Sequence, residues 1–139
     1  MTVHPNVQLL RDHFVAMESL DEEALSAQFT TDARYWPPIS AEQRGFVTRP
    51  LEPGASVVEM LTKLTPQLYG PDRTWTIQHL FADDESGAAH VELAATLVTS
   101  GKPFRNAYAF FYRFVDGQIA ELWEYTDTDY THGIHAESN

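Results

Sequence analysis

The chain has 139 residues, the length of one domain with a single hydrophobic core. Its 9 basic and 20 acidic residues give a formal net charge of -11, which disfavours a phosphate backbone or an anionic membrane surface as a partner. The absence of cysteine excludes disulfides, thiolate metal ligands and a cysteine nucleophile. There is no signal-peptide core and no apolar run of membrane-spanning length, so we expect a cytoplasmic protein that binds neither nucleic acid nor membrane.

The first half of the chain carries helical signals. An apolar stripe predicts a helix over residues 5–19, and a capping-box pattern at residues 19–22 predicts a second, short helix directly after it. Residues 31–38 then read as an extended segment, which its two prolines exclude from a central position in a sheet. Residues 39–54 are polar and without periodicity, which predicts either a functional lid or a mobile loop at the mouth of a pocket.

The second half predicts one more helix and four strands. A further capping-box pattern at residues 56–59 begins a helix that continues to residue 68, and strands are expected at 74–82 and 88–99. Two aromatic-rich runs flank Asp116 and Gly117, which is a strong signal for an antiparallel hairpin. We therefore predict an α+β fold, with three N-terminal helices on one side of a strongly bent antiparallel sheet.

The hairpin carries the pattern N-x-Y-x-F-x-Y-R-F-x-D-G-x-I-x-E-x-x-E-Y-x-D-T from Asn106 to Thr128. It resembles the closing hairpin of the SnoaL-like branch of the nuclear transport factor 2-like superfamily, which includes ketosteroid isomerases, limonene epoxide hydrolases and scytalone dehydratases. The resemblance implies a cone-shaped sheet around an apolar cavity, and a homodimer through the outer face. We expect a single SnoaL-like domain at residues 1–130 and a loose polar tail at 131–139.

Glu124 is the first candidate for a catalytic residue. Strand alternation puts it on the same face as Ala120 and Leu122, where an apolar environment raises the pKa of a carboxyl and makes it a usable acid or base near neutral pH. The resemblance implies the same role, because the matching position holds an active-site acid in epoxide-hydrolase-like and phenazine-biosynthesis-like relatives. The alternative is a flipped strand that leaves Glu124 in solvent and buries Trp123.

Tyr108 is the second catalytic candidate, since a tyrosine hydroxyl in an apolar cavity can stabilise an oxyanion. Asn106 and Tyr112 share its face and are expected to contact substrate, although a stripe of Tyr and Phe on a strand is also typical of a plain core. His79 is the third candidate, as a proton relay: alternation groups it with Trp75 on a core-facing side. Residues 77–79 also resemble the strand that supplies a catalytic histidine in scytalone dehydratase, and the alternative is a core histidine with one hydrogen bond.

Further residues are expected to line the substrate site. His13 falls close to the position of the oxyanion-hole tyrosine of ketosteroid isomerase, although the edge of a buried helical stripe is the alternative interpretation. The other lining candidates are Phe14, Met17, Tyr35, Trp75 and Leu122.

The sequence also departs from the named enzymes. The positions of the two aspartates of ketosteroid isomerase hold Pro37 and Phe110, so a steroid isomerase of that kind is not expected. The Arg and Asp positions of the epoxide hydrolases hold Val91 and Leu93, and Glu92 reaches the cavity only if the strand register shifts by one residue.

These features together predict a cofactor-independent acid–base enzyme of isomerase, cyclase, dehydratase or epoxide hydrolase type, acting on a small apolar organic substrate. The alternative is a non-catalytic module of the same fold that binds a small ligand or serves as a dimerising accessory subunit. Three convergent metal ligands and a phosphate-binding loop cannot be assembled from the sequence, so neither a metal nor a cofactor is expected.

Overall fold

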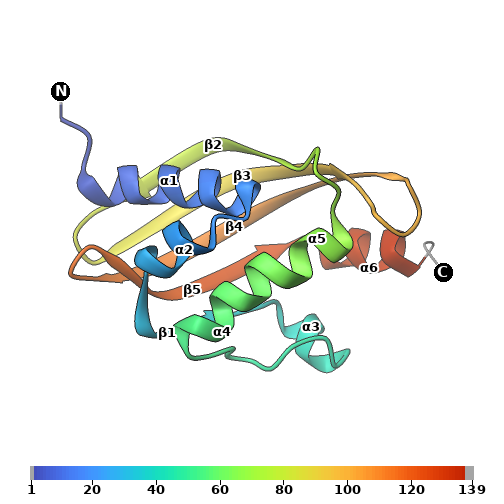
Figure 1. Cartoon of the computed structure of the whole chain (residues 1–139), viewed down its shortest axis with the longest axis horizontal. Helices are drawn as coiled ribbons and strands as arrows, with labels where there is room; N and C mark the ends of the chain where they lie inside the picture. Colours follow the sequence, from blue (N-terminus) through green and yellow to red (C-terminus); the bar gives the residue numbers. More distant parts are fainter. Residues whose placement is uncertain (1, 137–139) are drawn as a thin grey trace.

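The computed structural model describes residues 2–136 and is built on one five-stranded sheet with helices against one of its faces (Figure 1). The strands lie in the order β1-β5-β4-β3-β2. Their bounds are Phe29–Trp36 for β1, Thr74–Ala82 for β2, Ser86–Thr96 for β3, Pro103–Val115 for β4 and Gln118–Thr126 for β5. The predicted α+β class is confirmed.

The sheet is mixed, because β1 pairs with β5 in parallel while the other pairs are antiparallel. The prediction of an entirely antiparallel sheet is therefore wrong at this edge. Strand β1 is an edge strand, as expected from the prolines that follow Trp36. The hairpin between β4 and β5 is confirmed: Asp116 and Gly117 have φ values of 49° and 76°, and positive φ at both central residues is what a type I′ turn requires.

The helices begin and end close to the predicted positions. Helix α1 spans Pro5–Ser19 and α2 spans Glu22–Gln28, but the cap of α2 is Asp21, whose carboxylate accepts from the backbone N–H of Ala24 at 3.0 Å. A short helix α3 spans Ile39–Gln43. Helix α4, Gly54–Glu59, continues through a π-helical turn, η1 at Met60–Leu64, into α5 at Thr65–Leu68. No described helix is long and apolar enough to cross a membrane.

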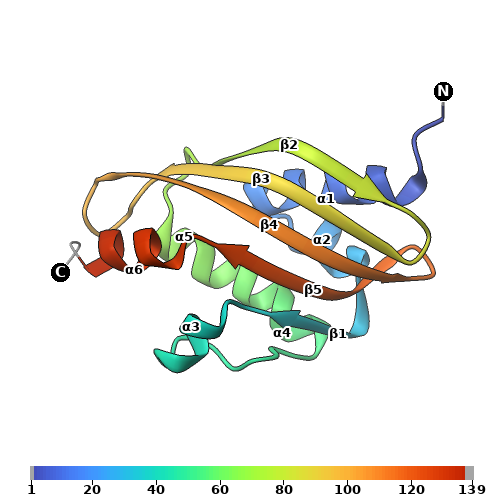
Figure 2. The ribbon, with the colours of Figure 1, turned by 180° about the vertical axis from the view of Figure 1, so that it is seen from behind.

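The two faces of the sheet differ. Helices α1, α2 and α4 lie over one face, as the front and back views show (Figures 1 and 2), and the hydrophobic core fills the space between them and the strands. The core includes Leu10, Phe14, Leu25, Val57, Phe104, Tyr108, Phe110 and Ile119. The outer face is uncovered and exposes large apolar side chains, among them Phe81, Phe111 and Tyr125.

The end of the chain forms helix α6, Thr128–Ala136. The prediction of a loose tail is wrong for residues 131–136, and residues 137–139 lie outside the described part of the chain. The side-chain amide of Asn106 donates to the carbonyl of Asp127 at 3.0 Å and to Thr131 Oγ1 at 2.8 Å, and this anchors the helix on β4. His132 of α6 lies 3.2 Å from Ser40 Oγ of α3, so residues 39–54 and α6 meet at one end of the molecule.

Candidate functional site

The carboxyl group of Glu124 lies on the inner face of β5. Glu124 pairs with Phe110 on β4, and the neighbouring inward residue, Leu122, pairs with Tyr35 on β1. The hydroxyl of Tyr35 donates to Glu124 Oε1 at 2.8 Å. Burial raises the pKa of Glu124 to about 7, although the Tyr35 hydrogen bond acts to lower it. The residue as a whole is half-buried, while its carboxyl group is desolvated.

Tyrosine hydroxyls surround this carboxyl. Burial, together with the nearby charge of Glu124, raises the pKa of Tyr69 to about 12, although a hydrogen bond with Tyr108 acts to lower it. Burial and the same charge also hold the pKa of Tyr35, Tyr108 and Tyr112 well above the ordinary value. All four groups therefore remain protonated hydrogen-bond donors at neutral pH. A carboxyl group that titrates near pH 7 beside neutral tyrosines is suited to moving a proton and stabilising an oxyanion.

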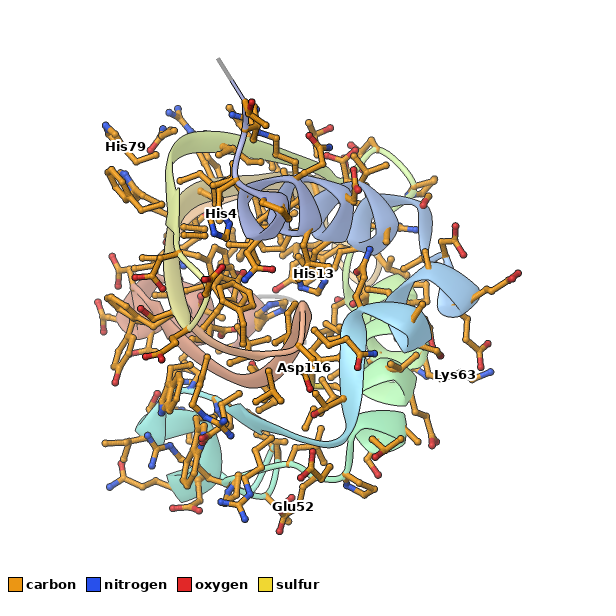
Figure 3. The ribbon with its side chains drawn as sticks, turned by 90° about the vertical axis from the view of Figure 1, so that its left-hand side faces the viewer. His4, His13, Glu52, Lys63, His79 and Asp116 are labelled. Carbon is orange, nitrogen blue, oxygen red and sulfur yellow. The ribbon has the colours of Figure 1, made fainter. Side chains whose placement is uncertain are left out.

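A second polar group lies deeper in the core. His13 is fully buried and points from α1 into the space that the sheet encloses (Figure 3). Its Nδ1 lies 3.0 Å from Gln28 Oε1, so Nδ1 carries the proton and Nε2 is an acceptor. Burial lowers the pKa of His13 to about 4, and the ring is neutral at pH 7. His13 Nε2 and the Tyr112 hydroxyl are buried without a hydrogen-bond partner, and the two rings lie 6.3 Å apart.

Aromatic side chains from three elements line the interior between these groups. The ring of Trp75 lies 5.2 Å from Tyr108 and 5.5 Å from Phe14, and Phe14 lies 5.9 Å from Phe110. Met17 and Leu122 are also buried. The expected lining residues are thus brought together, but their rings already contact one another. The open apolar cavity expected inside the cone stays a prediction.

His79 does not face this interior. The register between β2 and β3 shifts between Ile77, which pairs with Val91, and His79, which pairs with His90. A β-bulge reverses which face the following side chains take, so Ile77 faces the core while His79 is exposed on the outer face. The prediction that His79 lies with Trp75 on the core-facing side is wrong for this reason.

Two other expectations change once the contacts are seen. The amide of Asn106 is committed to α6, so the predicted role of Asn106 in orienting a ligand lacks a free donor. On β3, Val91 and Leu93 are buried, while Glu92 pairs with Arg105 at 2.7 Å on the outer face. The strand register therefore leaves apolar side chains at the Arg and Asp positions of the epoxide hydrolase pattern.

Two residues of the site, Tyr69 and Gln28, were not predicted from the sequence. Tyr69 directly follows the last residue of α5, where the apolar spacing of that helix could have marked it as buried. Gln28 precedes β1 with no sequence signal, and its role as the partner of His13 depends on the packing of α2 against α1. No group of three or more metal-ligating side chains lies together among residues 2–136.

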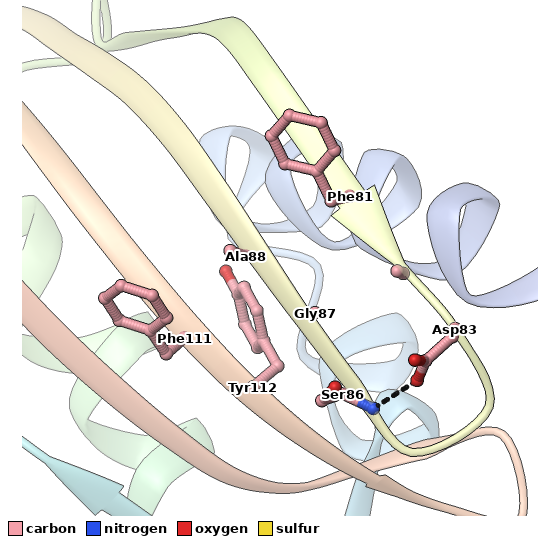
Figure 4. Close-up of a pocket in the computed structure, with 8 residues that line it drawn as sticks. Phe81, Asp83, Ser86, Gly87, Ala88, Phe111 and Tyr112 are labelled. Atoms are coloured by element: carbon pink, nitrogen blue, oxygen red, sulfur yellow. Dashed lines mark hydrogen bonds between the residues drawn. The ribbon is translucent and has the colours of Figure 1, made fainter.

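Two hollows lie on the outer face of the sheet. One is lined by Phe111, Trp123 and Tyr125. The other lies across the ends of β2, β3 and β4 and includes Phe81, Gly87 and Phe111 (Figure 4). Both are shallow and aromatic, and neither reaches Glu124.

This arrangement of a bent, open sheet around N-terminal helices is the nuclear transport factor 2-like α+β cone. The sequence matches the SnoaL-like domain over residues 10–122, so the chain belongs to the SnoaL-like family. A comparison with curated proteins finds no significant match.

Solved structures share the fold at low sequence identity. An NTF2-like protein of unknown function from Burkholderia pseudomallei K96243 has a TM-score of 0.79 at 16% identity, over 93% of this chain and 95% of that chain. Wild-type IdmH from Streptomyces antibioticus, a proposed polyketide cyclase, has a TM-score of 0.77 at 20% identity, over 94% and 97%. An LEH-like epoxide hydrolase of M. tuberculosis has a TM-score of 0.73 at 12% identity, over 93% and 87%.

Proposed function

We propose that this protein is a cofactor-independent enzyme that transfers a proton on a small apolar organic substrate. The observation that carries this proposal is the state of the Glu124 carboxyl. Burial raises its pKa to about 7, and the Tyr35 hydroxyl holds it in position by a hydrogen bond of 2.8 Å. A group with this pKa is present in both protonation states at pH 7, so it can remove a proton from one atom and return it to another. Isomerisation, cyclisation, dehydration and epoxide opening all use this step.

The tyrosines supply the second half of the chemistry. When Glu124 takes a proton from carbon or oxygen, negative charge develops on a substrate oxygen, and a neutral hydroxyl already in place stabilises it. Tyr108 and Tyr69 are suited to this because their hydroxyls stay protonated and lie close enough to Glu124 to respond to its charge. In this proposal Glu124 is the acid–base residue, and Tyr35 is a positioning residue that acts through it.

The two buried atoms without a partner, His13 Nε2 and the Tyr112 hydroxyl, support a substrate that carries a hydroxyl group. A hydroxyl can donate to the acceptor His13 Nε2 and accept from the Tyr112 hydroxyl, so one group would satisfy both buried atoms. A ketone could accept from Tyr112 but would leave the His13 nitrogen unpaired. An alcohol or phenol bound between His13 and Glu124 therefore fits the interior better than a carbonyl at the same depth.

The outer face supports a homodimer. Phe81, Phe111 and Tyr125 are exposed by 66%, 48% and 52%, and an exposed aromatic patch of this kind is typical of a protein interface. A second copy of the same face would cover it symmetrically. The interior site lies on the opposite side of the sheet, so dimerisation would leave it open.

A second function is favoured by the close ring contacts of Phe14, Trp75, Tyr108 and Phe110. If these rings hold the interior closed, the protein is a non-catalytic dimerising or ligand-holding module of the same fold. The two functions differ in whether Glu124 contributes to turnover.

The test is a substrate screen with matched variants. Epoxides, enones and polyketide-like hydroxyketones are incubated with wild type, Glu124→Gln and Glu121→Gln, and products are followed by mass spectrometry. The proposal expects Glu124→Gln to lower kcat/KM by about 10²–10⁴-fold, with Glu121→Gln close to wild type. Turnover that survives in Glu124→Gln would refute the assignment. Saturable ligand binding without any turnover would establish the non-catalytic function.

A further inference from the structure

Two histidines face each other on the outer side of the sheet, away from the candidate site. The shift in register places His79 of the edge strand β2 directly opposite His90 of β3. Their Nδ1 atoms lie 3.2 Å apart, and the ring planes are within 4° of parallel. Figure 3 shows His79 pointing away from the space that holds His13. Both residues are exposed in the single chain, and they lie at the β2 edge of the face proposed above for dimerisation.

The distance between the two nitrogens matches the bite of a chelated metal ion. An imidazole nitrogen binds a zinc-like ion at about 2.0–2.1 Å. Two such bonds to nitrogens 3.2 Å apart subtend about 103° at the metal, close to the tetrahedral angle. The two rings are parallel, so their in-plane lone pairs converge on one point only after the exposed rings rotate about χ2. The backbone register places the two side chains opposite each other, and this rotation completes the site.

We propose that His79 and His90 form a bidentate surface site for a transition-metal dication, with Cu²⁺ bound more tightly than Zn²⁺. The neighbours leave room for the ion and its remaining water ligands, because Ala109 lies opposite His90 on β4 and Ala88 lies two residues away on the same face. The nearby Glu92 is held by Arg105 and is not a third ligand. The net charge of -11 favours the approach of cations.

The site is independent of the proposed acid–base function, since it lies on the opposite face from Glu124.

The experiment uses tag-free, full-length protein titrated with Cu²⁺ and followed by electron paramagnetic resonance, with Zn²⁺ calorimetry in parallel. We expect one ion per chain and nitrogen superhyperfine structure from two imidazoles. His79→Gln or His90→Gln should each weaken binding by about tenfold or more, because the second ligand of a chelate acts at high effective concentration. His132→Gln is the matched control, since His132 and His135 lie on one helix and could themselves hold an ion.

His79 and His90 are exposed and His132 is half-buried, so circular dichroism is used to verify that each variant folds. Binding lost in both strand variants and kept in His132→Gln supports the site. Equal affinity in wild type and in the double variant His79→Gln/His90→Gln overturns it. Loss of binding in His132→Gln alone also overturns it, by moving the metal to α6.

Discussion

Replacing Glu124 with glutamine should make the protein more stable at alkaline pH. The folded-state pKa of Glu124 is about 7, above the ordinary 4.5. Between these values the folded protein holds a proton that the unfolded chain has released, so the free energy of unfolding falls as pH rises. A difference of about 2.5 pH units at about 1.36 kcal/mol per unit gives a loss of about 3 kcal/mol, complete above pH ~7. Glutamine keeps the hydrogen bond from Tyr35 and carries no charge to desolvate.

The assay is urea unfolding followed by tryptophan fluorescence from pH 4 to 8.5, on wild type and Glu124→Gln. The free energies of unfolding of the two proteins are compared at each pH. This is necessary because His13, present in both, makes stability rise with pH below 6.5, which opposes the effect of Glu124 in wild type. We expect the variant to gain up to about 3 kcal/mol relative to wild type as pH rises from 4.5 to 7. Parallel curves would refute the reasoning, since they would mean that Glu124 titrates alike in both states.

Glu121→Gln is the matched control on the same strand. Burial pushes the pKa of Glu121 up, but hydrogen bonds from Trp36 and Arg113 outweigh it and hold this pKa below its usual range. The carboxylate therefore contributes stability above its unfolded pKa, and that stability is lost as pH falls through the folded value. Glu121→Gln should be destabilising at neutral pH, opposite in sign to Glu124→Gln.

Three further predictions follow from the same contacts. Tyr35→Phe removes a hydrogen bond that lowers the pKa of Glu124, so the acid limb of activity should move up by about one pH unit in a pH–rate profile. His13→Gln should abolish a stability loss of about 3 kcal/mol that wild type shows as pH falls from 6.5 to 4, because the unfolded chain protonates this histidine first; acid-range urea unfolding measures it. Phe111→Glu should give monomers by size-exclusion chromatography with light scattering, while Val15→Glu on α1 leaves the dimer intact; unchanged dimers in both would exclude the outer face.

Local signals predicted the parts of the fold that depend on neighbouring residues. The hairpin follows from Asp116 and Gly117, because only a few residue types accept positive φ at both central positions. The inward side of Glu124 follows from its alternation with Leu122, because the register shift on β5 comes earlier, between Ile119 and Glu121. The pairing of β1 with β5 could not be predicted, since the partners are about ninety residues apart and parallel pairing leaves no turn to recognise.

The position of His79 and the contacts of Asn106 and Tyr69 could not be predicted, because each depends on a feature that local sequence does not show. The register shift beside Gln78 has no composition cue, yet it moves His79 to the outer face and so creates the pair with His90. The role of Asn106 depended on α6, a helix whose polar residues resemble a loose tail and which is anchored by tertiary contacts. Tyr69 joins the site through the contact of its ring with Phe104 of β4, whose ring centroid lies 4.9 Å away.

The most direct test of the account is the pKa of the Glu124 carboxyl itself. Protein labelled with ¹³C at the glutamate side-chain carboxyl is titrated by NMR from pH 3 to 9, and Glu124→Gln identifies the resonance. We expect the Glu124 carboxyl to titrate with a midpoint near 7. A midpoint near 4.5 would show a solvated carboxylate and would contradict the proposed role of Glu124 in proton transfer.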